Sequence, residues 1–268
     1  MKRTVWTVIV AALLLAIIIT CATVPITGRR QLSLIPRAQI TTMSFQEYDQ
    51  FLSSHKLSTN VENTATVKKV GLNIKRAVEK YFIANNMQSQ LNGYEWEFNL
   101  VEDSLVNAWC MPGGKVVVYT GLLPVTKTEN GLAVVMGHEI AHAIANHGEE
   151  RMSQGLLTQL GGIALDKALE QKPQETKNLY MTAFGLGAQL GVLLPFSRTH
   201  ESEADHMGLI FMAMAGYDPK GALEFWQRMA AQSGGANIPQ ILSTHPSDQT
   251  RIDNIKKYMP EALKYYKK

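Results

Sequence analysis

The hydrophobic positions along the chain change their period twice, which divides the sequence into three stretches. Between Met43 and Asn85, apolar side chains recur every three to four residues, which predicts two amphipathic helices. Between Tyr94 and Thr120 they alternate with polar residues, which predicts the strands of a small sheet. After Asn130 the helical period returns and continues almost to the C-terminus. The pattern therefore predicts a mainly helical α+β fold with a small mixed β-sheet and no internal repeat.

Turn residues and the last periodic positions set the expected boundaries of these elements. The expected helices cover residues 43–57, 64–85, 131–154, 156–170, 179–194, 199–215, 219–231 and 249–258. The expected strands cover residues 94–100, 106–110 and 115–120. We expect a single domain over residues 41–268, preceded by an extended tether over residues 21–40 that is rich in Pro and Gly.

Residues 1–20 have the layout of an export signal, in which a short basic region precedes the apolar run Val5–Thr20. Cys21 ends this run at the position where bacterial lipoprotein signals place a lipidated cysteine, although Thr20 departs from the small residue usual before it. A retained anchor helix and simple cleavage are the alternatives. We expect a lipid-anchored protein of the bacterial cell envelope, with most of the chain outside the cytoplasm. Ala22 favours the periplasmic face of an outer membrane.

Composition excludes several classes of protein. With 46% hydrophobic and 18% charged residues, the chain is typical of a globular protein and not of a disordered one. The chain has 26 Lys and Arg against 23 Asp and Glu, and without the two basic residues of the leader the balance is 24 − 23 = +1. This is too small for the basic footprint of a nucleic-acid-binding protein. The only cysteines, Cys21 and Cys110, exclude a disulfide framework and a Cys-rich zinc ribbon.

A metal-binding motif lies in the predicted helix after Asn130, where residues 138–142 read His-Glu-Ile-Ala-His. Residues i and i+4 share one face of a helix, so His138 and His142 can direct two imidazole nitrogens at one ion. Glu139 can then reach a water at the open metal position. The surrounding apolar residues predict a buried helix, in which these polar groups are costly unless they are satisfied. The alternative is a pair of surface histidines.

A second motif, Glu-Ser-Glu-Ala-Asp, lies 201 − 142 = 59 residues further on. Glu201 would be the third ligand of a His₂Glu site with an open fourth position. Asp205, one turn later on the same face, would accept a hydrogen bond from a ligand histidine and orient it. Glu203 is the competing third ligand, although it points about 200° around the helix from Glu201. The alternative is an acidic helix start that favours the macrodipole.

These residues resemble the gluzincin metallopeptidases of the HtpX and CAAX prenyl protease type, which include exported, lipid-anchored quality-control proteases of bacterial envelopes. The resemblance covers about residues 25–258 and includes an edge-strand segment, residues 107–123, and a C-terminal His-Pro motif that starts at Thr244. Cys110 and Met111 depart from the small or aliphatic residues common in the family's edge strand. The chain also lacks the multi-span membrane region of the prenyl-protein proteases.

The resemblance implies roles for residues outside the two motifs. A strand with a free edge can pair with an extended substrate, and we expect the substrate-binding edge to contain Gly113, Gly114, Lys115 and Val116. The two glycines would let the backbone approach closely, although a hairpin turn alone also explains them.

The family's C-terminal motif supplies two further candidates. His245 would either stabilise the oxyanion or coordinate the resting ion and block it, as relatives in the family imply. Arg251 is a second candidate donor for the oxyanion or for the carboxyl side of the substrate. The alternatives are a loop histidine before proline and a helix-surface arginine.

We therefore expect a zinc endopeptidase with one Zn²⁺ per chain, held by His138, His142 and Glu201. Zinc lowers the pKa of a coordinated water toward about 7, and Glu139 would take the proton and pass it to the leaving amine. Asp205 would orient a ligand or handle protons. The expected substrates are unfolded or misassembled envelope proteins, with the membrane reached through the N-terminal lipid and no nucleic-acid partner. The alternatives are a metal-binding, chaperone-like module with a silenced protease site, and a structural metal domain.

Overall fold

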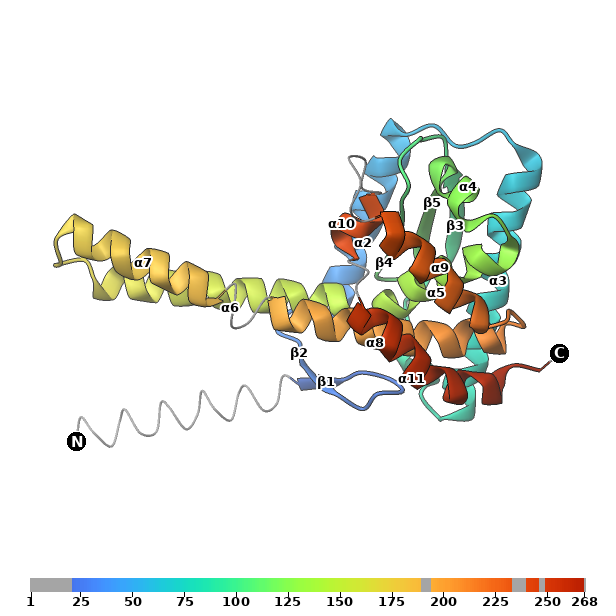
Figure 1. The fold of residues 1–268 in the computed structure, drawn as a ribbon. Coiled ribbons are helices and arrows are strands. Elements are labelled where there is room, and N and C mark those ends of the chain that lie inside the picture. Colours follow the sequence, from blue (N-terminus) through green and yellow to red (C-terminus); the bar gives the residue numbers. More distant parts are fainter. Residues whose placement is uncertain (1–20, 189–193, 233–239, 246–248, 268) are drawn as a thin grey trace. The chain divides into compact units, whose positions relative to one another are not determined.

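The computed structural model describes residues 21–188, 194–232, 240–245 and 249–267 (Figure 1). The chain forms two compact units, one from Met1–Arg37 and Asn146–Ser197 and the other from Ala38–Ala145 and Arg198–Lys268. Helices dominate, and the few strands are short, so the mainly helical α+β class is confirmed. In the part of the chain that the structure describes, no helix has both the length and the apolar composition needed to span a bilayer. The predicted leader lies outside the described residues.

The larger unit combines a three-stranded sheet with helices from both halves of the chain. Its first segment begins in the first turn of α2, and its second segment begins in the first turn of α8. Its strands and their flanking elements are α2 (Arg37–Ser54), α3 (Val61–Ala84), η1 (Gln88–Leu91), β3 (Glu97–Val101), β4 (Ala108–Met111), β5 (Lys115–Tyr119), η2 (Thr120–Leu122) and α4 (Leu123–Thr126). Its remaining helices are α5 (Glu129–Ile144), α8 (Leu194–Met214), α9 (Lys220–Gln232), α10 (Gln240–Thr244) and α11 (Gln249–Tyr265).

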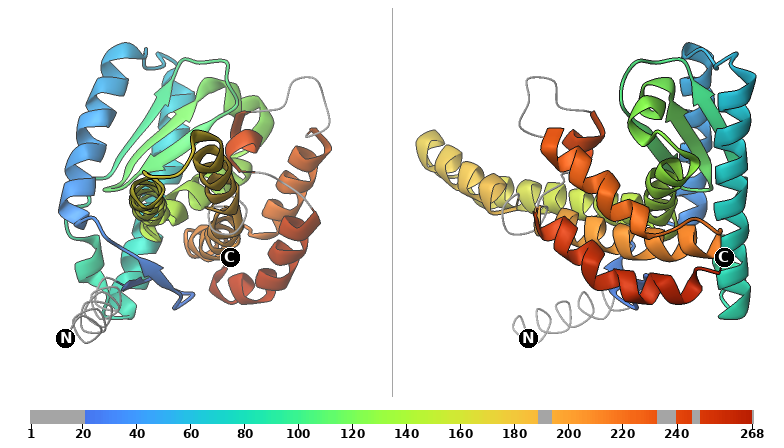
Figure 2. Two further views of the ribbon diagram at one scale, coloured as in Figure 1. Left: turned by 90° about the vertical axis from the view of Figure 1, so that its left-hand side faces the viewer. Right: turned by 45° about the vertical axis from the view of Figure 1, so that its right-hand side comes forward.

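Helices cover both faces of the sheet (Figure 2). On one face, Tyr48 of α2 packs in a buried cluster with Val117 and Tyr119 of β5. On the other face, α3 approaches β3 so closely that a Cβ atom at Gly71 would overlap the ring of Phe98. Helix α5 contacts β4 and α3, so it is enclosed between the sheet and the other helices. This enclosure is what buries the helix that carries the His-Glu-Ile-Ala-His motif.

The order of the strands corrects the expected substrate edge. The order is β3-β5-β4, with β5 parallel to β3 and antiparallel to β4. Lys115 and Val116 therefore lie on the central strand, where both edges are already paired, and the prediction that they form a free edge is wrong. The outer strands are β3, whose outer side is bridged to Leu57 at Val101, and β4, which pairs with β5 alone among the described strands. Hydrophobic alternation locates strands, but it does not give their order in a sheet.

The smaller unit contains β1 (Cys21–Thr23), β2 (Arg30–Leu32), α6 (His147–Ala168) and α7 (Gln174–Ala188). The expected extended tether instead forms an antiparallel hairpin in which Cys21 pairs with Leu32. The turn is possible because Ile26 and Gly28 adopt φ of 67° and 69°, in the left-handed region. Lipidation of Cys21 stays a prediction.

Two helix boundaries differ from the expected ones for identifiable reasons. The helix expected over residues 131–154 is divided, because Asn146 adopts a left-handed φ of 56° between α5 and α6. Asparagine tolerates this conformation. The helical period of apolar residues continues across Asn146, so the sequence pattern does not reveal the break. At the other end of the chain, α11 continues through Pro260 to Tyr265 instead of ending at Tyr258.

Candidate metal centre

Helix α5 carries two of the four residues of the site, His138 and His142. Its own sequence explains where it begins and why it is buried. The Thr128 hydroxyl accepts a hydrogen bond from the Gly131 amide at 3.1 Å, which caps the helix, and Glu129 in the first turn favours its dipole. Every residue from Gly131 to Ile144 is buried. His138 and His142 are only 2% and 7% exposed, so both imidazoles are held in a nearly dry environment.

A glycine contact between α5 and α8 brings the two motifs together. A Cβ atom at Gly208 would lie 3.0 Å from the Gly137 carbonyl carbon and 3.0 Å from the His138 amide nitrogen. A Cβ at Gly137 would meet the Gly208 carbonyl oxygen at 3.1 Å. The two backbones therefore touch one residue before His138. This close crossing brings Glu201, two turns earlier on α8, to the histidine face of α5.

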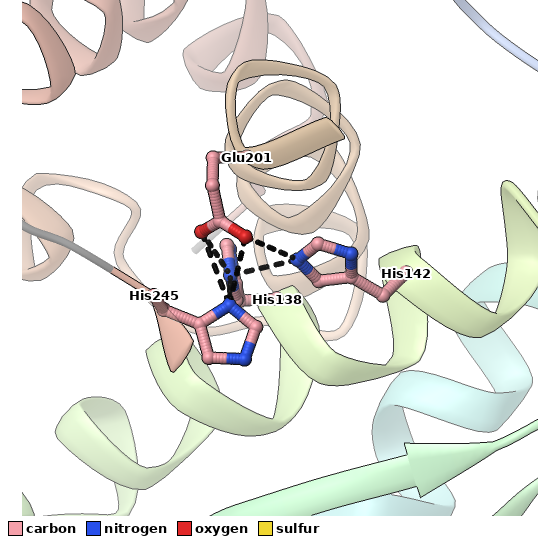
Figure 3. Close-up of side chains that lie close together, drawn as sticks. All are labelled: His138, His142, Glu201 and His245. Atoms are coloured by element: carbon pink, nitrogen blue, oxygen red, sulfur yellow. Dashed lines mark hydrogen bonds and ion pairs between the residues drawn. The ribbon is translucent and has the colours of Figure 1, made fainter. Parts of the chain in front are cut away.

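Three predicted ligands and one further histidine converge on a single point (Figure 3). The Nε2 atoms of His138 and His142 lie 3.1 Å apart. The Glu201 carboxylate lies 3.3 Å from each of these nitrogens, through a different oxygen in each case. His245 completes the group, because its Nδ1 lies 3.2 Å from His138 Nε2 and 2.9 Å from Glu201 Oε1. One donor atom from each of the four residues lies within 4.8 Å of the others.

These spacings fit a divalent cation. Ligands at about 2.0–2.1 Å from a tetrahedral zinc ion are about 3.3–3.4 Å apart, close to the distances among the four donor atoms. Imidazole nitrogens together with one carboxylate also suit zinc better than a hard cation such as calcium, which takes oxygen ligands. A cation among them would satisfy two imidazole nitrogens that otherwise face each other. The residues present therefore fit a bound zinc ion.

The electrostatics of the cluster favour an ionised Glu201. Burial opposes its ionisation, but hydrogen bonds from the neighbouring histidines outweigh burial and hold the Glu201 pKa well below its usual range. Burial lowers the pKa of His142 far below its ordinary value, which keeps this imidazole neutral and able to donate a lone pair. In His138, burial and the Arg251 charge oppose protonation, but hydrogen bonds to carboxylates prevail and raise the pKa to about 9.

Asp205 lies where a ligand-orienting carboxylate is expected. Its Oδ1 is 3.0 Å from Nδ1 of His138, the ring nitrogen that does not face the cluster. This contact fixes the orientation of the ring. Asp205 also accepts hydrogen bonds from Nε and Nη2 of Arg251 at 2.8 and 2.7 Å.

Arg251 does not have the geometry expected of a substrate-binding residue. It is 5% exposed, and besides its bidentate pairing with Asp205 it stacks on Trp226, with its Cζ 3.3 Å from the ring centroid. Its Nη1 donates a hydrogen bond to the His245 carbonyl oxygen at 3.3 Å. The guanidinium therefore holds the chain around His245 and Asp205 in place, a role that needs no contact with substrate.

Glu139 is buried beside the cluster, on the side where His245 lies. It is 4% exposed, and its Oε1 has no hydrogen-bond partner among the described residues, although Nε2 of His245 lies 3.5 Å away. A buried carboxylate oxygen without a partner is costly, and catalytic sites are where such groups are kept. Cys110 of β4 lies near enough that, after burial, the Glu139 charge is the next cause that raises its thiol pKa.

The other expected substrate residues have local structural roles. Gly113 and Gly114 adopt φ of 90° and 89°, and Cβ atoms there would overlap the rings of Phe45 and Trp96. The hairpin-turn explanation accounts for both. Lys115 lies 3.4 Å from the Glu97 carboxylate and over the Phe45 ring, so its charge is satisfied within the sheet region.

Sequence reasoning missed two contributors to the site. Trp226 lies on the amphipathic helix α9, where an aromatic residue predicts core packing and gives no signal of stacking on Arg251. Gly208 has no side chain that could indicate a function, although a glycine three residues after a ligand motif on a helix can indicate close helix packing. Glu203, the competing third ligand, is not in the donor cluster.

Comparison with known proteins identifies a family and several relatives that this chain resembles. The model of the family described as Peptidase family M48 matches residues 69–259. The chain is 38% identical over 65% of its length to the mitochondrial metalloendopeptidase OMA1 of Schizosaccharomyces pombe, of which it covers 50%. It is 30% identical over 90% of its length to the human metalloendopeptidase OMA1, mitochondrial, of which it covers 46%. The chain spans about half the length of these curated relatives.

A bacterial relative is also found, with lower coverage. The beta-barrel assembly-enhancing protease of Escherichia coli is 28% identical over 59% of the chain, and the chain covers 33% of it. The relatives with higher coverage are not named as HtpX, CAAX proteases or exported lipoproteins, so that finer resemblance is not supported. They are named as mitochondrial, which contradicts the expected location. The prediction of a location in the bacterial cell envelope is therefore wrong.

Proposed function

The chain belongs to peptidase family M48, and from this premise we propose that it is a zinc-dependent endopeptidase. One observation carries the proposal. Donor atoms of His138, His142 and Glu201 converge from two helices. Beside them lies the buried carboxylate of Glu139, whose Oε1 has no hydrogen-bond partner among the described residues. When bound, zinc would polarise the scissile carbonyl and acidify a water molecule.

The protein's own residues would then handle the proton and hold the geometry. Glu139 accepts the proton of the attacking water and later donates it to the leaving amine. Asp205 fixes the His138 ring through Nδ1, and Arg251 fixes Asp205. Glu139, Asp205 and Arg251 are buried, so packing fixes the positions of their side chains. This supplies the orientation that catalysis requires.

The free edge of β4 is the proposed binding site for the substrate backbone. The Tyr119 amide donates to the Asn107 carbonyl at 3.1 Å, so residues 107, 109 and 111 face β5 in the antiparallel alternation. The backbone groups of Ala108 and Cys110 consequently face away from β5. An extended segment of an unfolded or misassembled protein would pair with them, beside α5 and Glu139.

His245 is proposed to close the site in its resting state. Its Nδ1 lies among the donor atoms of the three proposed ligands, and its Nε2 lies 3.5 Å from Glu139. In this position His245 would be a fourth donor to the ion in place of a water. Proteolysis therefore requires His245 to withdraw, which makes its chain segment the control point of the site.

Exchange of the general base tests this function. The Glu139→Gln variant keeps the volume of the side chain but removes the proton acceptor, so casein cleavage is expected to fall by about 10²–10⁴-fold. Bound zinc, measured by mass spectrometry, stays at one per chain. The matched control is Glu224→Gln, an exposed carboxylate of α9, which leaves cleavage unchanged.

A variant without the His245 imidazole distinguishes the peptidase proposal from the chaperone-like alternative. The His245→Ala variant is expected to cleave casein faster than the parent protein. If zinc-loaded parent and His245→Ala proteins both leave casein intact, the peptidase proposal fails. Suppression of casein aggregation under the same conditions would then favour the chaperone-like module.

A further inference from the structure

Helix α6 exposes a row of apolar side chains that its own unit does not cover. Met152, Leu156, Leu157, Leu160 and Ile163 are 42%, 38%, 44%, 52% and 59% exposed. At about 100° per residue, these five side chains fall within an arc of about 140° around the helix. We call this surface the α6 apolar face.

Helix α7 packs along α6 (Figure 1). Cβ atoms at Gly161 and Gly162 would lie 3.0 and 3.6 Å from the Phe184 ring of α7, which places these glycines in the contact between the helices. Both glycines lie outside the arc of the α6 apolar face. Among the described residues of this unit, α7 therefore leaves the face open.

The α6 apolar face is unusual in its extent. Single exposed apolar residues are normal in soluble proteins, but five in one arc over three helical turns form a continuous patch. Helix α7 also exposes apolar side chains, those of Leu179 and Tyr180, which are 70% and 54% exposed. Such patches occur where a partner or a membrane covers them.

The N-terminal hairpin indicates which occupant covers the face. Arg29 forms a bidentate ion pair with Glu150 at 2.9 and 2.6 Å, and Glu150 is 1% exposed. The Ser33 hydroxyl donates to Glu149, and the Leu34 amide donates to the Ser153 hydroxyl at 3.0 Å. The first two turns of α6 therefore hold the hairpin through three side chains, those of Glu149, Glu150 and Ser153.

This contact fixes where the apolar N-terminal segment joins the unit. Cys21 pairs with Leu32, next to Ser33, so the chain enters the hairpin directly beside the start of α6. The residues before it, Val5–Thr20, are 16 uncharged and almost wholly apolar positions. Where it is retained, as in the anchor alternative, a segment of this composition partitions into a bilayer, as an anchor or as an interfacial helix. Ser33 and Leu34, which follow Leu32, contact Glu149 and Ser153, and Met152, where the α6 apolar face begins, precedes Ser153 in α6.

We propose that the α6 apolar face lies against a lipid bilayer, to which the N-terminal segment recruits it through the hairpin. The occupant is the interface between headgroups and acyl chains, where exposed Leu, Ile and Met side chains are buried while the rest of α6 stays in water. Membrane contact at α6 is then a separate property from peptidase activity.

Site-specific photo-crosslinking of the full chain tests this proposal. The photoreactive residue benzoylphenylalanine replaces Leu160 or, as a control, the exposed Arg151 on the opposite side of α6. Each protein is reconstituted into phosphatidylcholine and phosphatidylethanolamine vesicles that contain an alkyne-tagged phosphatidylcholine. We expect a lipid adduct at position 160 that is several-fold stronger than the adduct at position 151. Adducts of equal strength, or a position-160 adduct to residues 5–20 or to a second chain, overturn the proposal.

A charge placed on the face provides the second measurement. Leu157→Glu is expected to lower the lipid adduct at position 160 several-fold, because a carboxylate resists transfer into the interface. The same charge at Arg151→Glu leaves the adduct unchanged. Both positions are exposed, so neither variant is expected to change the melting temperature in solution. An unchanged adduct in Leu157→Glu contradicts membrane contact at this face.

Discussion

At the scale of single residues, Asp205 connects the proposed ligand His138 to Arg251 of the C-terminal helix α11. Its carboxylate contacts Nδ1 of His138 at 3.0 Å and receives two hydrogen bonds from Arg251. Trp226 covers the other side of the guanidinium. A change at Asp205 therefore affects both the orientation of a ligand and the compensation of a buried charge.

The Asp205→Asn variant is expected to bind zinc about 10–100-fold more weakly, because its amide holds the His138 ring less firmly. It also replaces the carboxylate that pairs with Arg251 through two hydrogen bonds by a neutral amide, which is expected to cost about 3–5 kcal/mol of unfolding free energy. Zinc titration and urea unfolding measure the two effects. Asp253→Asn, an exposed change on α11, serves as the control. Zinc affinity equal to that of the parent would show that Asp205 does not orient a ligand.

The residues predicted from the sequence are those whose relation is local. His138 and His142, like Glu201 and Asp205, are i and i+4 pairs, so the helical period alone puts each pair on one face. The role of Arg251 was not predictable in this way, because its partner Asp205 is 46 residues earlier in the chain. Only the packing of α8 against α11 reveals that the guanidinium is buried.

At the scale of elements, the crossing of α5 and α8 depends on two glycines. The Gly208→Ala variant places a methyl group 3.0 Å from the backbone of Gly137 and His138, so the helices must separate by a few tenths of an ångström. Overpacking of this kind costs about 1–3 kcal/mol. Because the two helices carry different ligands, we also expect weaker zinc binding and slower casein cleavage.

The matched control for this change is Gly155→Ala on α6. A Cβ at Gly155 meets nothing within 4 Å, so the only expected effect is the gain in helix propensity, about 1 kcal/mol. Thermal unfolding and zinc titration compare the two variants. Equal zinc affinity of Gly208→Ala and the parent would contradict the importance of the crossing.

The free edge of β4 makes a second prediction at this scale. Cys110→Pro removes one outward-facing amide, while the proposed ladder bonds of residues 109 and 111 to β5 remain, a position where an edge strand tolerates proline. We expect the KM for an extended peptide substrate to rise several-fold with zinc content unchanged. Cys110→Ala, which keeps the amide, separates the loss of the N–H from the loss of the thiol. Identical KM values for the Pro and Ala variants would contradict substrate pairing at β4.

The elements themselves were more predictable than their arrangement. Alternation and helical period gave the two N-terminal helices, the three strands and the helical C-terminal half, because each depends on local burial. The order β3-β5-β4 was not predictable, since it depends on a parallel crossover between β3 and β5. The assignment of the substrate edge to Lys115 and Val116 failed for this reason.

At the scale of the whole molecule, the proposed zinc ion would join segments that are far apart in the sequence. Its donors come from α5, from α8 and from the residue after α10, all within the larger unit. A cation that binds the folded chain and not the unfolded one stabilises it by mass action, about 4 kcal/mol at a thousandfold excess over Kd. Removal of zinc is therefore expected to destabilise the larger unit as a whole.

Chelation is expected to lower the melting temperature by about 8–16 °C, because each kcal/mol corresponds to about 2–4 °C for a unit of this size. Re-addition of zinc restores it, whereas calcium does not, since imidazole nitrogens are poor ligands for a hard cation. Scanning calorimetry of the full chain, before and after EDTA treatment, measures the change. His142→Ala removes one donor and is expected to abolish the zinc-dependent rise, while His206→Ala, outside the cluster, retains it. A melting temperature that does not respond to zinc in the parent protein would mean that the four side chains converge for a reason other than metal binding.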